Sequence, residues 1–184
     1  MATGTMLFDM AGATPADGTG TINNPPAANV LVSTGTQPAN APKATLIEWL
    51  FDAATDEHLS WAFRMPENYS SGGTLKIQVK NKSTQVGTNS FVVKSCLAAV
   101  TPGATENVDT KVFPAPDTLT ITLANAQASG ILVEGSLALS ATALNSVVAG
   151  DEVTLFLGRD ADNASDTATG DMSLVGLALE YTTT

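Results

Sequence analysis

The chain of 184 residues contains one histidine, His58, and one cysteine, Cys96. A lone thiol excludes a disulfide framework, and a lone imidazole leaves little material for a zinc centre or for acid-base catalysis. The sequence also lacks a glycine-rich phosphate loop and the CxxC, HExxH and GxSxG motifs that mark redox, metallopeptidase and serine hydrolase sites. We therefore expect a protein that has no catalytic activity and that needs no cofactor.

Charged residues are scarce, at 14% of the chain, and most of them are acidic. The 18 acids against 8 bases give a formal net charge of -10. This balance disfavours nucleic acid as a partner, because its phosphates attract basic surfaces. The chain shows no secretory signal pattern and no apolar run near the roughly 20 residues of a membrane helix. We therefore expect synthesis in a cytoplasm and no membrane partner.

From residue 45 onward the sequence alternates between apolar and polar residues in short runs, each closed by a Gly, Pro, Asn or Asp turn signal. Alternation with a period of two is typical of strands that bury one face, and about eight such runs are typical of a two-sheet sandwich. We therefore predict an all-β fold, a jelly roll or two-sheet antiparallel β-sandwich, over residues 45–184. The predicted strands are residues 45–51, 58–64, 75–82, 90–100, 117–123, 130–140, 152–159 and 172–182.

The first two runs contain both tryptophans of the chain, Trp49 and Trp61. In the second run Leu59, Trp61 and Phe63 share one face, so we expect both indoles near the core. The short break between the runs predicts a β-hairpin. A single helix over residues 44–63 is the alternative, which the aromatic content and the polar break at 55–57 disfavour.

Residues 1–44 differ from the rest, with five prolines among repeated Gly, Ala, Thr and Asn. We predict that they form an extended N-terminal arm outside the sandwich domain. Two apolar islands interrupt the arm, at residues 6–10 and 30–32. They either dock on a neighbouring subunit or pack on their own sandwich. The candidate docking residues are Met6, Leu7, Phe8 and Met10.

Lysines are concentrated in one part of the chain. In the run 75–82, Lys76, Gln78, Lys80 and Lys82 alternate with apolar residues and are expected to point outward. Acids crowd the C-terminal part instead, so a basic stripe on one subunit could face an acidic rim on the next. The alternative is an ordinary solvated strand face.

The segment 159–167 is rich in Asp and Asn, with oxygen-bearing side chains at alternate positions. Asp160, Asp162 and Asp166 are therefore candidate ligands for a calcium ion. The segment lacks the central Gly and the closing Glu of an EF-hand loop. Hydrogen bonds to its own backbone, with Arg159 pairing with Asp166 or Asp171, are the favoured alternative.

Three motifs, WAFRMP at 61–66, LFLGRD at 155–160 and LALEY at 177–181, resemble those of small jelly-roll virion proteins of tailed bacteriophages. Proteins of that kind are trimeric decoration, or cement, proteins on the outside of an icosahedral capsid. The resemblance implies a homotrimer on the capsid exterior of the virion. There it would clamp neighbouring copies of the major capsid protein against internal DNA pressure. It implies no catalytic residue.

A second hypothesis comes from the fold class, because β-sandwiches often host sugar sites built from exposed aromatic side chains. The chain would then be a carbohydrate-binding β-sandwich or a tail-associated adhesin of a phage. With both tryptophans expected in the core, few aromatic side chains are left to stack on a sugar. The sequence alone leaves both hypotheses open.

Overall fold

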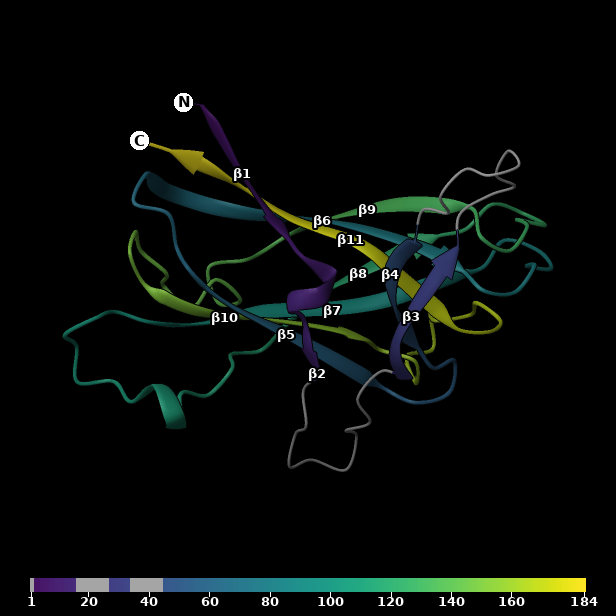
Figure 1. Ribbon diagram of the computed structural model, residues 1–184, viewed down its shortest axis with the longest axis horizontal. Helices are drawn as coiled ribbons and strands as arrows, with labels where there is room; N and C mark the ends of the chain where they lie inside the picture. Colours follow the sequence, from purple (N-terminus) through teal and green to yellow (C-terminus); the bar gives the residue numbers. More distant parts are fainter. Residues whose placement is uncertain (1, 16–26, 34–44) are drawn as a thin grey trace.

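The computed structural model describes residues 2–15, 27–33 and 45–184 of the chain. These residues form strands and two short 3-10 helices (Figure 1). In chain order the elements are β1 (Thr3–Phe8), η1 (Met10–Gly12), β2 (Thr14–Pro15), β3 (Ala27–Ser33), β4 (Thr45–Phe51), β5 (Glu57–Arg64), β6 (Tyr69–Asn81), β7 (Ser90–Val100), η2 (Val108–Thr110), β8 (Asp117–Thr122), β9 (Leu132–Ala138), β10 (Glu152–Arg159) and β11 (Met172–Thr183).

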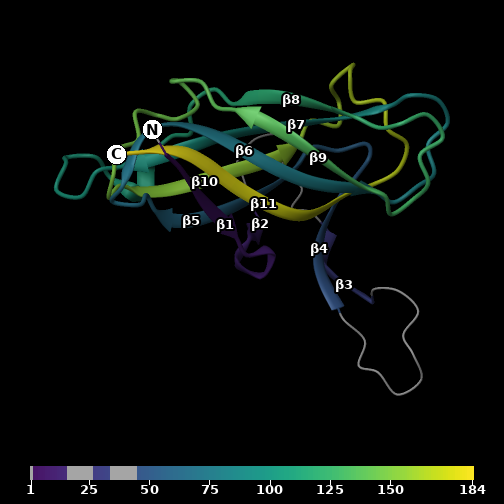
Figure 2. The same ribbon diagram turned by 90° about the horizontal axis from the view of Figure 1, so that it is seen from above.

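The strands form a six-stranded and a five-stranded antiparallel sheet. From β4 onward the chain pairs as a hairpin wound onto itself: β4 with β11, β5 with β10, β6 with β9 and β7 with β8. This nested pairing is the connectivity of a jelly roll, and Figure 2 shows one sheet lying over the other. The predicted eight-strand jelly roll is therefore confirmed, and three further strands precede it.

The core lies between the two sheets and follows the predicted alternation. On β6, Leu75, Ile77 and Val79 are fully buried, whereas Lys76 and Gln78 lie on the outer face. Strand β10 buries alternate residues in the same way. The described part of the chain contains no helix with the length and apolarity that a membrane crossing requires.

The predicted hairpin of the first two runs is wrong, because β4 and β5 belong to different sheets. The intervening turn is held by Asp52, whose Oδ1 accepts hydrogen bonds from the backbone N–H groups of Ala54 and Thr55 at 2.6 and 3.1 Å. This turn leads the chain from one sheet to the other instead of back along the same sheet. Alternation reports only which face of a strand is buried, so it does not distinguish these two paths.

The N-terminal segment 3–15 belongs to the sandwich, which corrects the prediction of an arm for these residues. Strand β1 pairs with β11 in one sheet, and β2 pairs with β5 in the other. Between them η1 closes the side of the sandwich, where Met10 is buried. The indole N–H of Trp49 donates to the carbonyl of Met10 at 2.7 Å, and that of Trp61 donates to the carbonyl of Asp9 at 3.0 Å.

The first apolar island therefore packs on its own chain. Met6 and Phe8 pack against the core, and the Phe8 ring lies 5.2 Å from that of Phe63. Leu7 points the other way and is 80% exposed. Of the four predicted docking residues, only Leu7 presents its side chain to solvent, because alternate residues of a strand face opposite sides.

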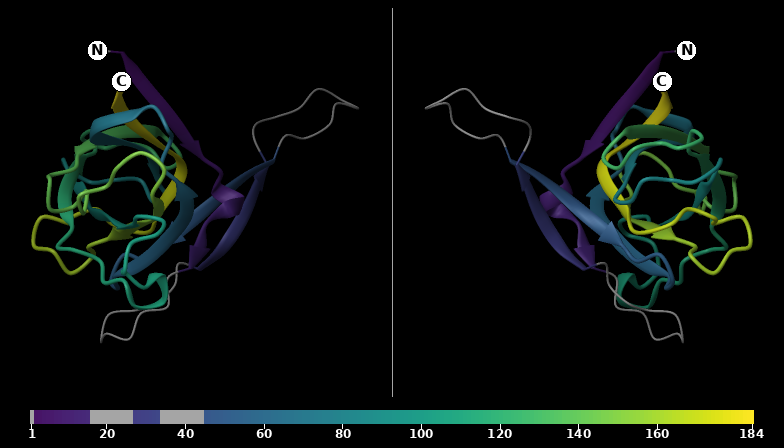
Figure 3. Two further views of the ribbon diagram at one scale, coloured as in Figure 1. Left: turned by 90° about the vertical axis from the view of Figure 1, so that its left-hand side faces the viewer. Right: turned by 90° about the vertical axis from the view of Figure 1, so that its right-hand side faces the viewer.

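Strand β3, which contains the second island, pairs with β4 at the edge of the six-stranded sheet. The hairpin of β3 and β4 projects away from the sandwich (Figure 3). The predicted arm also includes residues 16–26 and 34–44, which lie outside the described residues.

Candidate functional site

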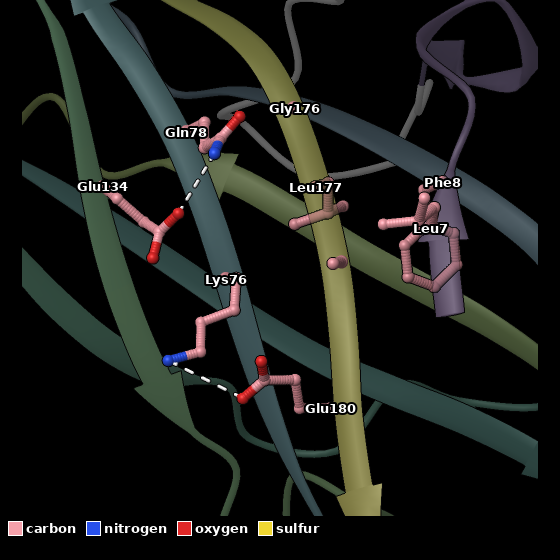
Figure 4. Close-up of a pocket in the computed structure, with 9 residues that line it drawn as sticks. Leu7, Phe8, Lys76, Gln78, Glu134, Gly176, Leu177 and Glu180 are labelled. Atoms are coloured by element: carbon pink, nitrogen blue, oxygen red, sulfur yellow. Dashed lines mark hydrogen bonds and ion pairs between the residues drawn. The ribbon is translucent and has the colours of Figure 1, made fainter. Parts of the chain in front are cut away.

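A surface concavity lies on the outer face of the six-stranded sheet (Figure 4). It is a groove of about 450 Å³ across four adjacent strands, β1, β11, β6 and β9. With neighbouring strands about 4.8 Å apart, its length across the strands is about 14 Å. Its lining residues are Leu7, Phe8, Lys76, Gln78, Glu134, Gly176, Leu177, Ala178 and Glu180.

Register brings the polar side chains of the groove together. Gln78 lies opposite Glu134 on β9, and Lys76 lies opposite Ser136. On the other side of β6 the pairing with β11 shifts between Leu174 and Gly176. A Cβ atom at Gly176 would lie 2.7 Å from Oε1 of Gln78, so glycine keeps the floor of the groove open.

The polar groups of the groove hold one another in place. The Gln78 amide donates to Oε2 of Glu134 at 3.0 Å. The Lys76 ammonium donates to Oγ of Ser136 at 3.0 Å and lies 3.6 Å from Oε2 of Glu180. Within the described residues the second carboxylate oxygen of each glutamate has no protein partner. These oxygens are therefore free to accept hydrogen bonds from a ligand.

The lysines of β6 do not form an unpaired basic stripe. Lys80 and Lys82 both pair with Glu48, which is fully buried. Burial alone would raise the pKa of Glu48, but hydrogen bonds from Lys80 and Ser173 outweigh burial and lower the pKa below its ordinary value. The three lysines predicted to face a neighbour thus have acidic partners in their own chain, because β11 lies beside β6 and β4 lies on the other side of β11.

The structure separates Asp166 from the other two predicted calcium ligands, Asp160 and Asp162. Asp166 forms a two-point ion pair with the guanidinium of Arg159, at 3.0 and 2.8 Å, and both side chains are buried. The alternative pairing of Arg159 with Asp166 is therefore confirmed, and Asp166 is not available to a metal ion. Asp56, which precedes β5, instead lies with Asp160 and Asp162, with carboxylate oxygens within 4.8 Å of one another.

A protein cation already occupies this acidic cluster. The ammonium of Lys94 donates to Asp56 and, at 2.8 Å, to Asp160. Burial would lower the pKa of Lys94, but these two hydrogen bonds outweigh burial and raise the pKa, so the group stays charged. Oδ1 of Asp56 also accepts the backbone N–H of Ala161 at 2.8 Å. The lysine supplies the positive charge that a metal ion would bring.

His58 lies on the outer face of the five-stranded sheet and is buried, not exposed as a hairpin histidine would be. Its ring stacks on that of Phe156, with 4.9 Å between the centroids. Burial lowers the pKa of His58 below its ordinary value. The described residues provide no hydrogen-bond partner for its Nδ1, so no carboxylate orients it as a catalytic base.

We expect Glu57 to make the stability of the protein fall as pH rises from 5 to 8. Burial raises the pKa of Glu57 from 4.5 to about 7, although a hydrogen bond from Asp52 N at 2.6 Å opposes this rise. A raised pKa stabilises the fold below pH 4.5, and this contribution is lost as pH passes 7. The loss amounts to about 3 kcal/mol at most. Urea unfolding at pH 5 and pH 8 measures it.

The matched variant is Glu57→Gln, which keeps an acceptor for Asp52 N but cannot ionise. It should be more stable than the wild type at pH 8 and similar at pH 5. The difference between the two proteins isolates Glu57, because His58 contributes equally to both. Equal pH dependence in the two proteins would contradict the prediction.

Comparisons with known proteins add only a likeness of fold. No protein-family model matches the chain, and no curated protein matches it significantly. A family 35 carbohydrate-binding module from Clostridium thermocellum is similar in structure, with a TM-score of 0.49, 9% identity and coverage of 96% of this chain and 97% of that one. A carbohydrate-binding module specific for non-crystalline cellulose has a TM-score of 0.47, 13% identity and coverage of 90% and 86%.

The cleaved K3 adhesin domain of Lys-gingipain from Porphyromonas gingivalis is also similar. Its TM-score is 0.43, with 16% identity over 92% of this chain and 91% of that one. Likeness at these levels concerns the β-sandwich and carries no argument about what this chain binds.

Sequence reasoning did not identify the groove. Alternation predicts that Gln78 lies on an outer face. It does not predict that Glu134 and Glu180 lie nearby, because they come from strands distant in the sequence. The sequence does contain one indication of their role. Glu134 and Glu180 lie within alternating runs, and this alternation predicts that their side chains are on an outer face.

Proposed function

We propose that the protein is a non-catalytic carbohydrate-binding β-sandwich that holds a neutral polysaccharide chain in the groove of the six-stranded sheet. The groove itself carries this proposal, because it presents amide, carboxylate, ammonium and hydroxyl groups in fixed positions along an open channel. A sugar hydroxyl both donates and accepts hydrogen bonds, so it matches such a mixed set. An open groove also leaves the two ends of a polymer unobstructed.

Charge balance supports a neutral ligand. The outer face of the sheet carries three lysines, Lys76, Lys80 and Lys82, against Glu48, Glu134 and Glu180 in the described part of the chain. The whole chain, in contrast, has a formal net charge of -10. An anionic polysaccharide would be repelled by the molecule without finding an unpaired cation in the groove.

Apolar atoms at one side of the groove also suit a sugar ligand. Leu7 is exposed on β1 and lines the groove together with the half-buried Ala178, which lies opposite it on β11. Figure 4 shows Leu7 on β1 at the opposite side of the groove from Gln78 and Glu134. Pyranose rings have C–H faces as well as hydroxyl edges, and burial of those faces against leucine is favourable.

Gln78→Ala and Glu134→Ala should each weaken polysaccharide binding by about 10-fold or more, because each leaves its partner without a hydrogen bond and removes a contact to the sugar. Native gel electrophoresis through hydroxyethyl cellulose or galactomannan measures the retardation of each variant. Polygalacturonate, which is anionic, serves as the comparator and should not retard the wild type.

Glu67→Gln is the control variant, because Glu67 pairs with Arg64 in an exposed position and does not line the groove. It should migrate as the wild type does. Thermal unfolding of every variant verifies that the fold is retained. Wild-type protein that migrates freely in both neutral polysaccharides would refute the proposal.

A second candidate function is capsid decoration by a homotrimer that binds the major capsid protein on the outside of a virion. The projecting hairpin of β3 and β4 favours it, since such a hairpin extends the contact surface beyond the sandwich (Figure 3). The sequence motifs that resemble phage virion proteins favour it as well. Light scattering and co-sedimentation with empty phage shells test this function. A monomer that stays in the supernatant would exclude it.

A further inference from the structure

A second pocket lies on the opposite side of the sandwich, on the outer face of the five-stranded sheet. Lys94 and Cys96 alternate on β7 with the core residues Val93 and Leu97, so they point away from the core. The pocket has a volume of about 200 Å³. Its lining residues are Lys94, Cys96, Phe113, Pro114, Pro116 and Phe156.

The aromatic part of this pocket comes from a segment that crosses the sheet. We define residues 101–116, between β7 and β8, as the cover segment; it forms the long loop with η2 in Figure 1. Phe113 in this segment is 40% exposed, and its ring lies 5.8 Å from that of Phe156 at an angle of 50°. The two phenyl rings and the two prolines give the pocket C–H and π surfaces of the kind that contact sugar rings.

The polar edge of the pocket has an unused donor. The ammonium of Lys94 has three N–H groups. In the described structure two of them are taken by Asp56 and Asp160, which leaves one for a ligand. The ammonium contacts the carboxylates of Asp56 and Asp160, and a carboxylate oxygen of Asp162 lies within 4.8 Å of theirs, so an anionic ligand is disfavoured. The free donor requires a neutral acceptor such as a hydroxyl.

The cover segment can adjust to a ligand at low cost. Its hydrogen bonds among the described residues are internal, such as those from Ala104 N to Thr101 O at 3.0 Å and from Thr110 N to Asn107 O at 3.2 Å. It rests on the sheet through Phe113 and the prolines that line the pocket. Moving it by a small amount therefore breaks no hydrogen bond to the sheet.

We infer that this pocket is a second pyranose-binding site, in which a neutral sugar ring lies against Phe113 and Phe156 and accepts a hydrogen bond from Lys94. This inference rests on the proposed function, because it assigns the same class of ligand to a second face. The groove and the pocket lie on opposite outer faces of the sandwich. One molecule then binds two polysaccharide chains and cross-links them.

Titration calorimetry with cellohexaose and mannohexaose tests the inference. The wild type should bind two molecules of the effective hexasaccharide per chain. Phe113→Ala and Gln78→Ala should each keep one site at its wild-type affinity and weaken the other by about 10-fold or more, and the double variant should weaken both. Hydroxyethyl cellulose or galactomannan should become more viscous with the wild type and not with either single variant. Phe113→Trp should retain the second site, because the larger ring keeps the stacking surface.

Val112→Ala is the matched control, since Val112 is 79% exposed in the same segment and does not line the pocket. It should bind as the wild type does. A wild type with one site that Gln78→Ala weakens and Phe113→Ala leaves intact would overturn the second site but retain the proposed function. Absence of binding by the wild type to either hexasaccharide and to both neutral polysaccharides would overturn both.

Discussion

Asp166→Ala is expected to lower the free energy of unfolding by about 3 to 5 kcal/mol, because it leaves the guanidinium of Arg159 buried without its counter-charge. Arg159 is fully buried, and its two hydrogen bonds to Asp166 measure 3.0 and 2.8 Å. The same carboxylate accepts the backbone N–H of Val92 at 2.9 Å, so the substitution also leaves a strand donor without its partner. Urea unfolding followed by tryptophan fluorescence measures the loss.

Two further variants separate the missing charge from a general effect of substitution in this loop. Asp162→Ala, at an exposed position in the same segment, should change stability by less than about 0.5 kcal/mol. The double variant Arg159→Met with Asp166→Leu removes both charges and should recover part of the loss. A loss below about 1 kcal/mol in Asp166→Ala would show that Arg159 finds other partners, such as the carbonyl of Gly170 at 3.0 Å.

Met10→Ala should lower the free energy of unfolding by about 2 to 5 kcal/mol, because it empties a buried site between the two sheets. Leu7→Ala, in the same apolar island, should change it by less than about 0.5 kcal/mol. The contrast follows from exposure, since Met10 is 7% exposed and Leu7 is 80% exposed. Equilibrium unfolding of the two variants measures both values.

The same experiment distinguishes packing on the protein's own sandwich from docking on a neighbour. If Met10 packs on its own chain, its loss of stability is independent of protein concentration. If the island docks on another subunit, the loss grows with concentration, because association stabilises the wild type by mass action. Equal losses in Met10→Ala and Leu7→Ala would contradict the arrangement of β1 and η1 in the structure.

The candidate site was only partly predictable from the sequence. Alternation in residues 75–82 placed Lys76 and Gln78 on an outer face, and the structure confirms that placement. The partners of these residues, Glu134 and Glu180, come from β9 and β11, and local patterning does not specify which strands become neighbours. Phe113 was not identified for a similar reason, because it lies in an irregular segment with no periodicity to interpret.

The amino-acid sequence by itself determined the class of fold and the inside and outside of most strands. Alternation of apolar and polar residues is a local property, and burial of one face of each strand follows from it directly. The tertiary structure decided which strands are neighbours, and hence that β4 and β5 lie in opposite sheets and that the carboxylate of Asp166 pairs with Arg159. These pairings depend on contacts between residues far apart in the chain, which no local pattern encodes.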